Sequence, residues 1–201
     1  IPVSHHVNRG NWSRWGFGSD QMLSRMTIGI IGLGRIGSKV AKICNAFGMK
    51  VVYHDIEKKN TKYKYHKTIE SLALTSDVIS LHVPFNKETE NMLNESFFHI
   101  AQLKKPYIIN TARGEIICEK SLLFAIKKGL ISGAALDVLS LEFSENFKNS
   151  KERKELIKLS KKQPNLIITP HIAGSTKDAW HLTQERVIKK CFKYLKEKKE
   201  I

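Results

Sequence analysis

The stretch TIGIIGLGRIGSKVAKICNAFGMKVVYHD, Thr27–Asp55, decides the fold. An apolar run, Ile28–Ile31, is followed by the glycine-rich turn Gly32-x-Gly34-x-x-Gly37. A helical pattern, Ile36–Phe47, comes next, and a second apolar run, Val51–Tyr53, precedes the carboxylate of Asp55. A strand, a glycine turn, a helix and a further strand make up the first part of a dinucleotide-binding α/β unit. The segment therefore predicts a Rossmann-type fold.

Each glycine of the motif has its own physical reason. Gly32 allows a tight turn after the strand, Gly34 lets the backbone approach a pyrophosphate, and Gly37 lets the helix and the strand pack closely. The N-terminus of the following helix offers free N–H groups and a positive dipole end to the phosphates. This adds the first helical residues, Arg35 and Ile36, to the predicted cofactor site. A glycine turn in a fold that binds no nucleotide is the alternative.

Asp55, at the end of the second apolar run, predicts which cofactor is used. Its carboxylate would accept hydrogen bonds from the adenosine ribose hydroxyls and would repel a 2′-phosphate. NAD is therefore predicted rather than NADP. Lys58 and Lys59 lie close by in the sequence and work against this preference.

The rest of the chain continues the alternation of strands and helices. Further apolar runs are Val78–Val83, Tyr107–Ile109, Ala134–Val138 and Leu166–Ile168, and helical patterns cover Ile69–Leu74, Glu95–Leu103, Lys120–Lys128, Asn149–Leu159 and Thr176–Lys199. This order predicts a doubly wound α/β fold with a mostly parallel sheet and helices on both faces. The polar segment Phe143–Gln163 is interpreted as an insertion or exposed helix between the last two strands.

Composition narrows the function classes. The chain has 201 residues and a net charge of +15, but its lysines are spread along many segments and mixed with glutamates. Solvated surfaces are therefore expected, with no nucleic-acid or membrane partner, and no apolar run is long enough to span a bilayer. The start shows no secretory signal. Cys44, Cys118 and Cys191 lie far apart without metal-ligand spacing, which indicates a reduced, cytoplasmic setting and no metal site.

Residues that a core does not need follow three of the later apolar runs. They are Arg113, then Asp137 and Glu142, and finally His171. Because the carboxyl ends of parallel strands share one edge, these side chains are expected to converge beside a bound nicotinamide. A guanidinium holds a substrate carboxylate, an imidazole moves the hydroxyl proton, and a carboxylate beside that imidazole raises its pKa. Taken singly, Arg113 and Glu142 could be surface residues and His171 a satisfied core histidine.

Five stretches carry a family resemblance. They are GIIGLGRIGSKVAKICNAFGMKVVYHD, SDVISLHVPFNKETENMLN, YIINTARGEII, SGAALDVLSLE and NLIITPHIAGST. In order and spacing they resemble the D-isomer-specific 2-hydroxyacid dehydrogenase family. The resemblance implies that Arg113 binds substrate and that His171 is the acid/base with Glu142 as its partner. It also implies a cofactor cleft; its residues are Asp137 at the nicotinamide end, His82, Val83, Pro84, Thr111, Ala112 and Gly174.

By this resemblance the chain is an NAD-dependent oxidoreductase that interconverts a small 2-hydroxy acid and its 2-keto acid. Related formate dehydrogenases carry Gln at the position of Glu142, so the glutamate favours hydroxy acids. Phe143 departs from the proline that often follows it in the family. Phosphoglycerate, glycerate and lactate-like acids all remain open. A non-catalytic, corepressor-like NAD sensor is the alternative, and a nucleic-acid binder would require salt-sensitive binding.

The resemblance also implies a domain organisation. The family builds its substrate domain mostly from residues that precede the cofactor domain, whereas only Ile1–Met26 precede the first strand here. We expect a connecting helix and lead-in segment in 1–26, the NAD-binding domain in 27–176, and a C-terminal helix that returns to the substrate domain in 177–201. Such a fragment is expected to turn over poorly by itself. Family members commonly pair through the cofactor domain, so a homodimer is expected.

Overall fold

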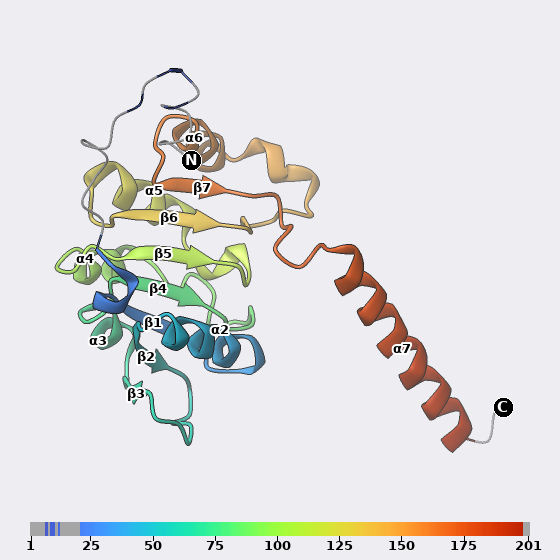
Figure 1. Cartoon of the computed structure of the whole chain (residues 1–201). Helices are drawn as coiled ribbons and strands as arrows, with labels where there is room; N and C mark the ends of the chain where they lie inside the picture. The colour runs from blue at the N-terminus through green and yellow to red at the C-terminus, as the bar shows by residue number, and fades with distance from the viewer. Residues whose placement is uncertain (1–6, 8, 11, 13–20, 199–201) are drawn as a thin grey trace. The chain divides into compact units, whose positions relative to one another are not determined.

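The computed structural model describes residues 7, 9–10, 12 and 21–198 (Figure 1). It divides into two compact units, Ile1–Ile168 and Thr169–Ile201. The expected connecting helix falls mostly on residues outside the described part. Of that lead-in segment, a short 3-10 helix η1, Leu23–Arg25, directly precedes the first strand.

The first unit is built on a seven-stranded parallel sheet in the order β3-β2-β1-β4-β5-β6-β7 (Figure 1). The strands are β1 Thr27–Ile31, β2 Lys50–His54, β3 Lys64–Tyr65, β4 Val78–Leu81, β5 Tyr107–Asn110, β6 Gly133–Leu136 and β7 Leu166–Ile168. The predicted doubly wound parallel sheet is confirmed, and all six predicted strands are present. The sequence did not predict β3, because its two residues form no apolar run.

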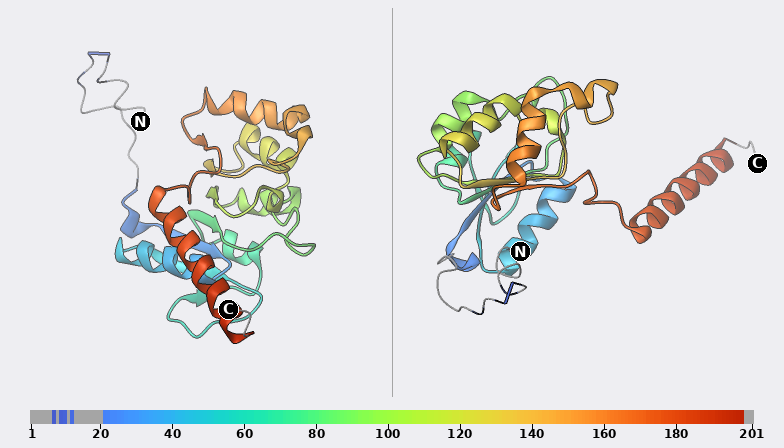
Figure 2. Two further views of the ribbon diagram at one scale, coloured as in Figure 1. Left: turned by 90° about the vertical axis from the view of Figure 1, so that its right-hand side faces the viewer. Right: turned by 90° about the horizontal axis from the view of Figure 1, so that it is seen from above.

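Helices cover both faces of the sheet (Figure 2). They are α2 Arg35–Ala46, α3 Ile69–Ala73, α4 Glu95–Ala101, α5 Glu119–Lys128 and α6 Lys151–Ser160, joined by the 3-10 helices η2 Gly114–Ile116 and η3 Glu145–Asn149. Helices α3 to α6 bury the larger apolar cluster on one face, with Leu72, Phe97, Leu122 and Leu156 fully buried. Helix α2 covers Ile28, Ile30 and Val51 on the other face.

Local signals explain where several helices begin and end. The side chains of Thr68, Asn94 and Ser150 each accept a hydrogen bond from a backbone N–H in the first turn of α3, α4 and α6. Gly129 ends α5 in the left-handed conformation, at φ 64°, which costs glycine little.

Helix α6 differs from its sequence-based interpretation as an insertion or exposed helix. It is the crossover helix between β6 and β7, and it contacts α5 and β7. Its buried side chains are Leu156 and, unexpectedly, Arg153. The lysine-rich sequence hid this role, because only a narrow apolar stripe faces the sheet.

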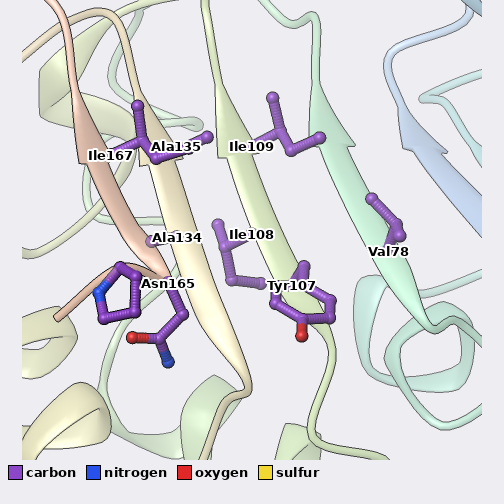
Figure 3. A pocket seen from close by; sticks show the side chains of 9 residues that line it. Val78, Tyr107, Ile108, Ile109, Ala134, Ala135, Asn165 and Ile167 are labelled. Atoms are coloured by element: carbon purple, nitrogen blue, oxygen red, sulfur yellow. The ribbon is translucent and has the colours of Figure 1, made fainter. Parts of the chain in front are cut away.

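Helix α2 covers one face of the sheet at β1 and β2. On the same face, the half of the sheet formed by β5, β6 and β7 is uncovered. Strand register aligns Ile109, Ala135 and Ile167 on this face, beside Val78 and Tyr107. They line a concave region of about 560 Å³ (Figure 3). Tyr107 is 42% and Ile167 49% exposed. Within the described part of the first unit, no helix lies over this face of β5, β6 and β7 (Figure 2).

The second unit contains one long helix, α7, Lys177–Glu197. Thr176 caps it, with its Oγ1 accepting a hydrogen bond from the Ala179 N–H at 3.1 Å. The predicted helix is therefore present in the described residues.

Candidate cofactor and substrate site

The carboxyl ends of the strands form one row across the sheet. Register pairs Ile31 of β1 with Leu81 of β4, Leu81 with Asn110 of β5, and Asn110 with Leu136 of β6. The next residues along each strand therefore lie at one edge; they are Gly32, His82, Thr111 and Asp137. This edge is where ligands bind in open α/β sheets.

The glycine turn lies where the strand order reverses, between β1 and β4. Gly32 has φ +91°, and a Cβ there would come within 2.8 Å of Val83 Cγ1 and 2.9 Å of the His82 carbonyl. A Cβ on Gly37 would lie 2.0 Å from the Gly32 carbonyl oxygen. Both positions therefore need glycine, as the motif predicts.

The N-terminus of α2 is open to an anion. Its N-cap is Gly34, no side chain caps it, and its first turn contains no acidic residue. A Cβ built on Gly34 would meet nothing within 4 Å, and Arg35 and Ile36 are exposed. The uncapped N–H groups and the helix dipole fit the pyrophosphate of a dinucleotide.

The Asp55 carboxylate lies against the glycine turn. Its Oδ2 accepts a hydrogen bond from the Leu33 N–H at 2.8 Å. Of the two nearby lysines, Lys59 contacts it, with 3.6 Å between Nζ and Oδ1, while Lys58 is exposed. The hydrogen bond to Glu57, together with the charge of Asp55, raises the pKa of Lys59, so a cation stays beside the Asp55 carboxylate.

The segment after β4 brings His82 and Val83 beside this turn, and the exposed Pro84 follows them. The His82 N–H donates to the Ile31 carbonyl at 2.8 Å, which continues the strand pairing by one residue. The imidazole Nε2 lies 2.9 Å from Ser80 Oγ. Burial lowers the pKa of His82, so the imidazole is held neutral.

A buried asparagine shapes the turn that carries Arg113. Asn110 is 1% exposed, and its Nδ2 donates to the Arg113 carbonyl at 2.8 Å. Its Oδ1 accepts from the Ala112 N–H at 3.0 Å. Arg113 itself is exposed, with Nη1 donating to the Ala112 carbonyl at 2.6 Å. Thr111 is exposed and Ala112 half-buried, so the turn presents a guanidinium at the ligand-binding edge.

The loop after β6 is tied to the same turn. The Asp137 N–H donates to the Asn110 carbonyl at 2.9 Å, and Asp137 is buried while Glu142 is half-buried. Glu115 Oε1 accepts from the Leu141 N–H at 3.0 Å. The Glu115 side chain thus joins the segment after Arg113 to the backbone beside Glu142. Sequence reasoning missed Glu115 because nothing in its local pattern distinguishes it from a surface glutamate.

His171 and Gly174 belong to the second unit. The His171 N–H donates to the Thr169 carbonyl at 3.1 Å, and His171 has φ +53°. Gly174 is exposed. The pairing of His171 with Glu142, and the contact of Gly174 with the cofactor, stay predictions from the sequence.

The described residues contain neither a metal-ligand cluster nor a membrane-spanning helix. Among them, no group of three or more His, Cys, Asp and Glu side chains could hold a metal ion. No helix in the same residues combines the length and the apolar character needed to cross a membrane.

The family model described as D-isomer specific 2-hydroxyacid dehydrogenase, NAD binding domain, matches residues 2–173. The chain belongs to this family. The resemblance seen in the five sequence stretches is confirmed. NAD, predicted from Asp55 and the glycine motif, is confirmed as the cofactor of this NAD-binding domain.

Individual members of the 2-hydroxyacid dehydrogenase family match along nearly the whole chain. D-3-phosphoglycerate dehydrogenase of Haemophilus influenzae is 38% identical over 191 residues, covering 94% of this chain and 44% of that protein. Glyoxylate reductase of Aeropyrum pernix is 34% identical and covers 89% of this chain and 53% of its own length. A structure of D-lactate dehydrogenase from Aquifex aeolicus with NAD and lactic acid superimposes with a TM-score of 0.86 at 34% identity, covering 99% of this chain and 62% of that one.

The chain spans only part of these family members. Its share of their length runs from 44% to 62%. The substrates named for them differ, although each is a small acid of the 2-hydroxy or 2-keto class.

Proposed function

We propose that the natural protein is an NAD-dependent oxidoreductase that interconverts a small D-2-hydroxy acid and its 2-keto acid. Bound NAD would supply or take up the hydride at its nicotinamide. Gly32, Gly34 and Gly37, the N-terminus of α2 and Asp55 would hold it, with His82–Pro84, Thr111 and Ala112 lining the cleft. The observation that supports this most is the single row of strand ends, from which these segments project.

Three side chains have proposed roles in the reaction. The exposed guanidinium of Arg113 binds the substrate carboxylate and polarises the neighbouring carbonyl. His171 donates a proton to the carbonyl oxygen during reduction and takes it back during oxidation. Glu142 stabilises the protonated imidazole. Asp137 faces the nicotinamide end of the cleft. The Asn110 hydrogen bonds support the first role, since they hold the Arg113 backbone in place.

The test is reduction of a panel of 2-keto acids by NADH, using the full-length natural protein. Pyruvate, glyoxylate, hydroxypyruvate and its phosphate represent the acids handled by relatives. Oxidation of NADH that depends on one of them supports the proposal. Saturable NADH binding without turnover of any panel member would instead favour the non-catalytic sensor.

We also propose the domain division expected from the sequence. Residues 27–176 form the NAD-binding domain, 1–26 lead into it, and 177–201 return to a substrate domain. Limited proteolysis of the natural protein with NADH bound checks this, since the cofactor protects 27–176 more than its flanks. A cytoplasmic, reduced setting is part of the proposal, and the unpaired Cys44, Cys118 and Cys191 support it. Cell fractionation of the natural protein tests the compartment.

The open half of the sheet supports a homodimer formed through the cofactor domain. Val78, Tyr107, Ile109, Ala135 and Ile167 form an apolar surface that a second copy would cover. Ile167→Glu places a charge on this surface at an exposed side chain and is expected to yield monomers in sedimentation equilibrium. Ile56→Glu, at a residue 87% exposed elsewhere, is the matched control. A dimer that survives Ile167→Glu contradicts pairing through this face.

A further inference from the structure

The backbone of Ser140, two residues before Glu142, is held from both sides. Its N–H donates to Glu119 Oε1 at 2.9 Å. Its carbonyl accepts from Arg153 Nη2 at 2.5 Å. Glu119 begins α5 and Arg153 lies in the first turn of α6. Side chains from two helices that cover the sheet therefore hold one backbone residue of the loop that carries Glu142.

The side chains of Arg153 and Glu119 also form an ion pair with each other. Arg153 Nη2 lies 3.2 Å from Glu119 Oε2, and Arg153 Nε donates to Glu119 Oε1 at 3.4 Å. Arg153 Nη1 donates to the Phe147 carbonyl, and its guanidinium carbon lies 4.3 Å from the centre of the Phe147 ring. Arg153 is only 3% exposed. A buried arginine that is paired and hydrogen-bonded on several sides fixes its partners in a single geometry.

The loop needs such support. Leu141, directly before Glu142, has φ +54°, a conformation that a leucine adopts only where its surroundings impose it. It is also 57% exposed, so side-chain packing does not hold it. The Leu141 N–H is held by Glu115.

The loop also touches the arginine turn directly. A Cβ on Gly114 would lie 2.0 Å from the Leu139 carbonyl carbon and 2.2 Å from the Ser140 nitrogen. The backbone after Arg113 and the backbone before Glu142 are therefore in contact. Whatever moves Ser140 changes the placement of Glu142 relative to Arg113.

We propose that Arg153 and Glu119 are positioning residues, which set the Glu142 loop against the Arg113 turn through the backbone N–H and carbonyl of Ser140. This inference rests on the proposed dehydrogenase function, in which Glu142 assists His171. It also gives the lysine-rich segment 143–163 a role. The segment contains the crossover helix α6 between β6 and β7. It also places the buried Arg153 side chain against the Ser140 backbone, next to the proposed site.

The test replaces the ion pair by apolar side chains of similar size, Arg153→Met with Glu119→Leu. Replacing both partners leaves no uncompensated buried charge, so the variant is expected to fold. The matched control is Lys127→Met with Glu155→Leu, because that exposed pair also joins α5 to α6 but does not touch the loop. Both double variants are made in the full-length natural protein.

In the double variant Arg153→Met with Glu119→Leu, here called the clamp variant, we expect NADH affinity to stay within about twofold. The kcat for keto-acid reduction should fall about tenfold or more, because the acid/base groups are displaced. The pH at which reduction is lost on the alkaline side should change as well, because the displaced Glu142 no longer lies against the proposed acid/base group. A purely structural role would leave that pH unchanged. Equal kcat and an equal pH profile in the wild-type, clamp and control proteins overturn the proposal.

A second measurement keeps the inference independent of activity. Amide hydrogen exchange of the peptide Val138–Ser144 should be faster in the clamp variant than in the wild-type and control proteins. Equal exchange in all three proteins contradicts the proposal that Arg153 and Glu119 hold the loop. If the wild-type protein reduces no keto acid, the proposed function fails, while the exchange experiment still decides whether Arg153 and Glu119 hold the loop.

Discussion

The Asp55 carboxylate accepts a hydrogen bond from the Leu33 backbone N–H at 2.8 Å, and this bond joins the end of β2 to the glycine turn after β1. The same carboxylate has Lys59 at 3.6 Å. Under the proposed assignment of Asp55 to the cofactor ribose, an anion that repels a 2′-phosphate and a cation that would attract one lie at the same end of the site. We expect their balance to decide the choice between NADH and NADPH.

Asp55→Ala is expected to weaken NADH binding about tenfold, because hydrogen bonds to a charged group contribute roughly 1.5–3 kcal/mol. Binding of NADPH should improve at the same time, since Lys59 then faces the 2′-phosphate without its carboxylate partner. Fluorescence titration with both cofactors measures this. In Asp55→Ala with Lys59→Met the gain for NADPH should disappear. An unchanged ratio of the two affinities in Asp55→Ala contradicts the assignment.

Arg113→Gln should leave NADH affinity nearly unchanged and lower kcat/KM for the keto acid about a hundredfold or more, as expected for loss of a charge-paired anchor. Steady-state kinetics and NADH titration of the full-length natural protein check the two effects separately. Arg25→Gln removes an exposed arginine just before β1, at the opposite edge of the sheet, and serves as the control. If Arg113→Gln retains wild-type kcat/KM, Arg113 does not bind the substrate.

Gly114→Ala tests the contact between the arginine turn and the Glu142 loop. The new methyl group would lie 2.0 Å from the Leu139 carbonyl carbon, and such overpacking costs about 1–3 kcal/mol of unfolding free energy. The backbone must shift, so we also expect lower kcat. Urea denaturation and kinetics measure the two effects. Wild-type stability and wild-type kcat in Gly114→Ala would contradict the contact between the arginine turn and the Glu142 loop.

His66 predicts how stability depends on pH. It is 7% exposed, and its Nε2 has no hydrogen-bond partner among the described residues. Burial, followed by the charge of Lys64, lowers its pKa from 6.5. The unfolded chain therefore binds more protons than the folded one as the pH falls below 6.5, and stability is lost in that direction.

Urea denaturation at pH 7.5 and pH 5.5 should thus show a smaller acid-induced loss of stability in His66→Gln than in the wild-type protein. His99→Gln removes an exposed histidine and is the control. Equal losses in His66→Gln and the wild-type protein would show that His66 does not contribute.

The fold could be predicted largely from local patterns. The apolar runs, the glycine spacing of Gly32, Gly34 and Gly37, and the helix caps are encoded within a few residues of where they act, because hydrophobic periodicity and backbone conformation are local properties. The two-residue strand β3 escaped prediction, since its pairing with Val52 and Tyr53 comes from the neighbouring strand and not from its own sequence.

By itself, the sequence determined the α/β class, the family, the NAD motif and the chemical types of the candidate site residues. Only the tertiary structure decided how those segments are held together. Asn110 under the Arg113 turn, Glu115 at Leu141, and Arg153 with Glu119 at Ser140 are all contacts across turns or between elements. Residues up to 34 positions apart meet there, and a charged side chain that becomes buried on folding looks, in the sequence, like any other surface residue.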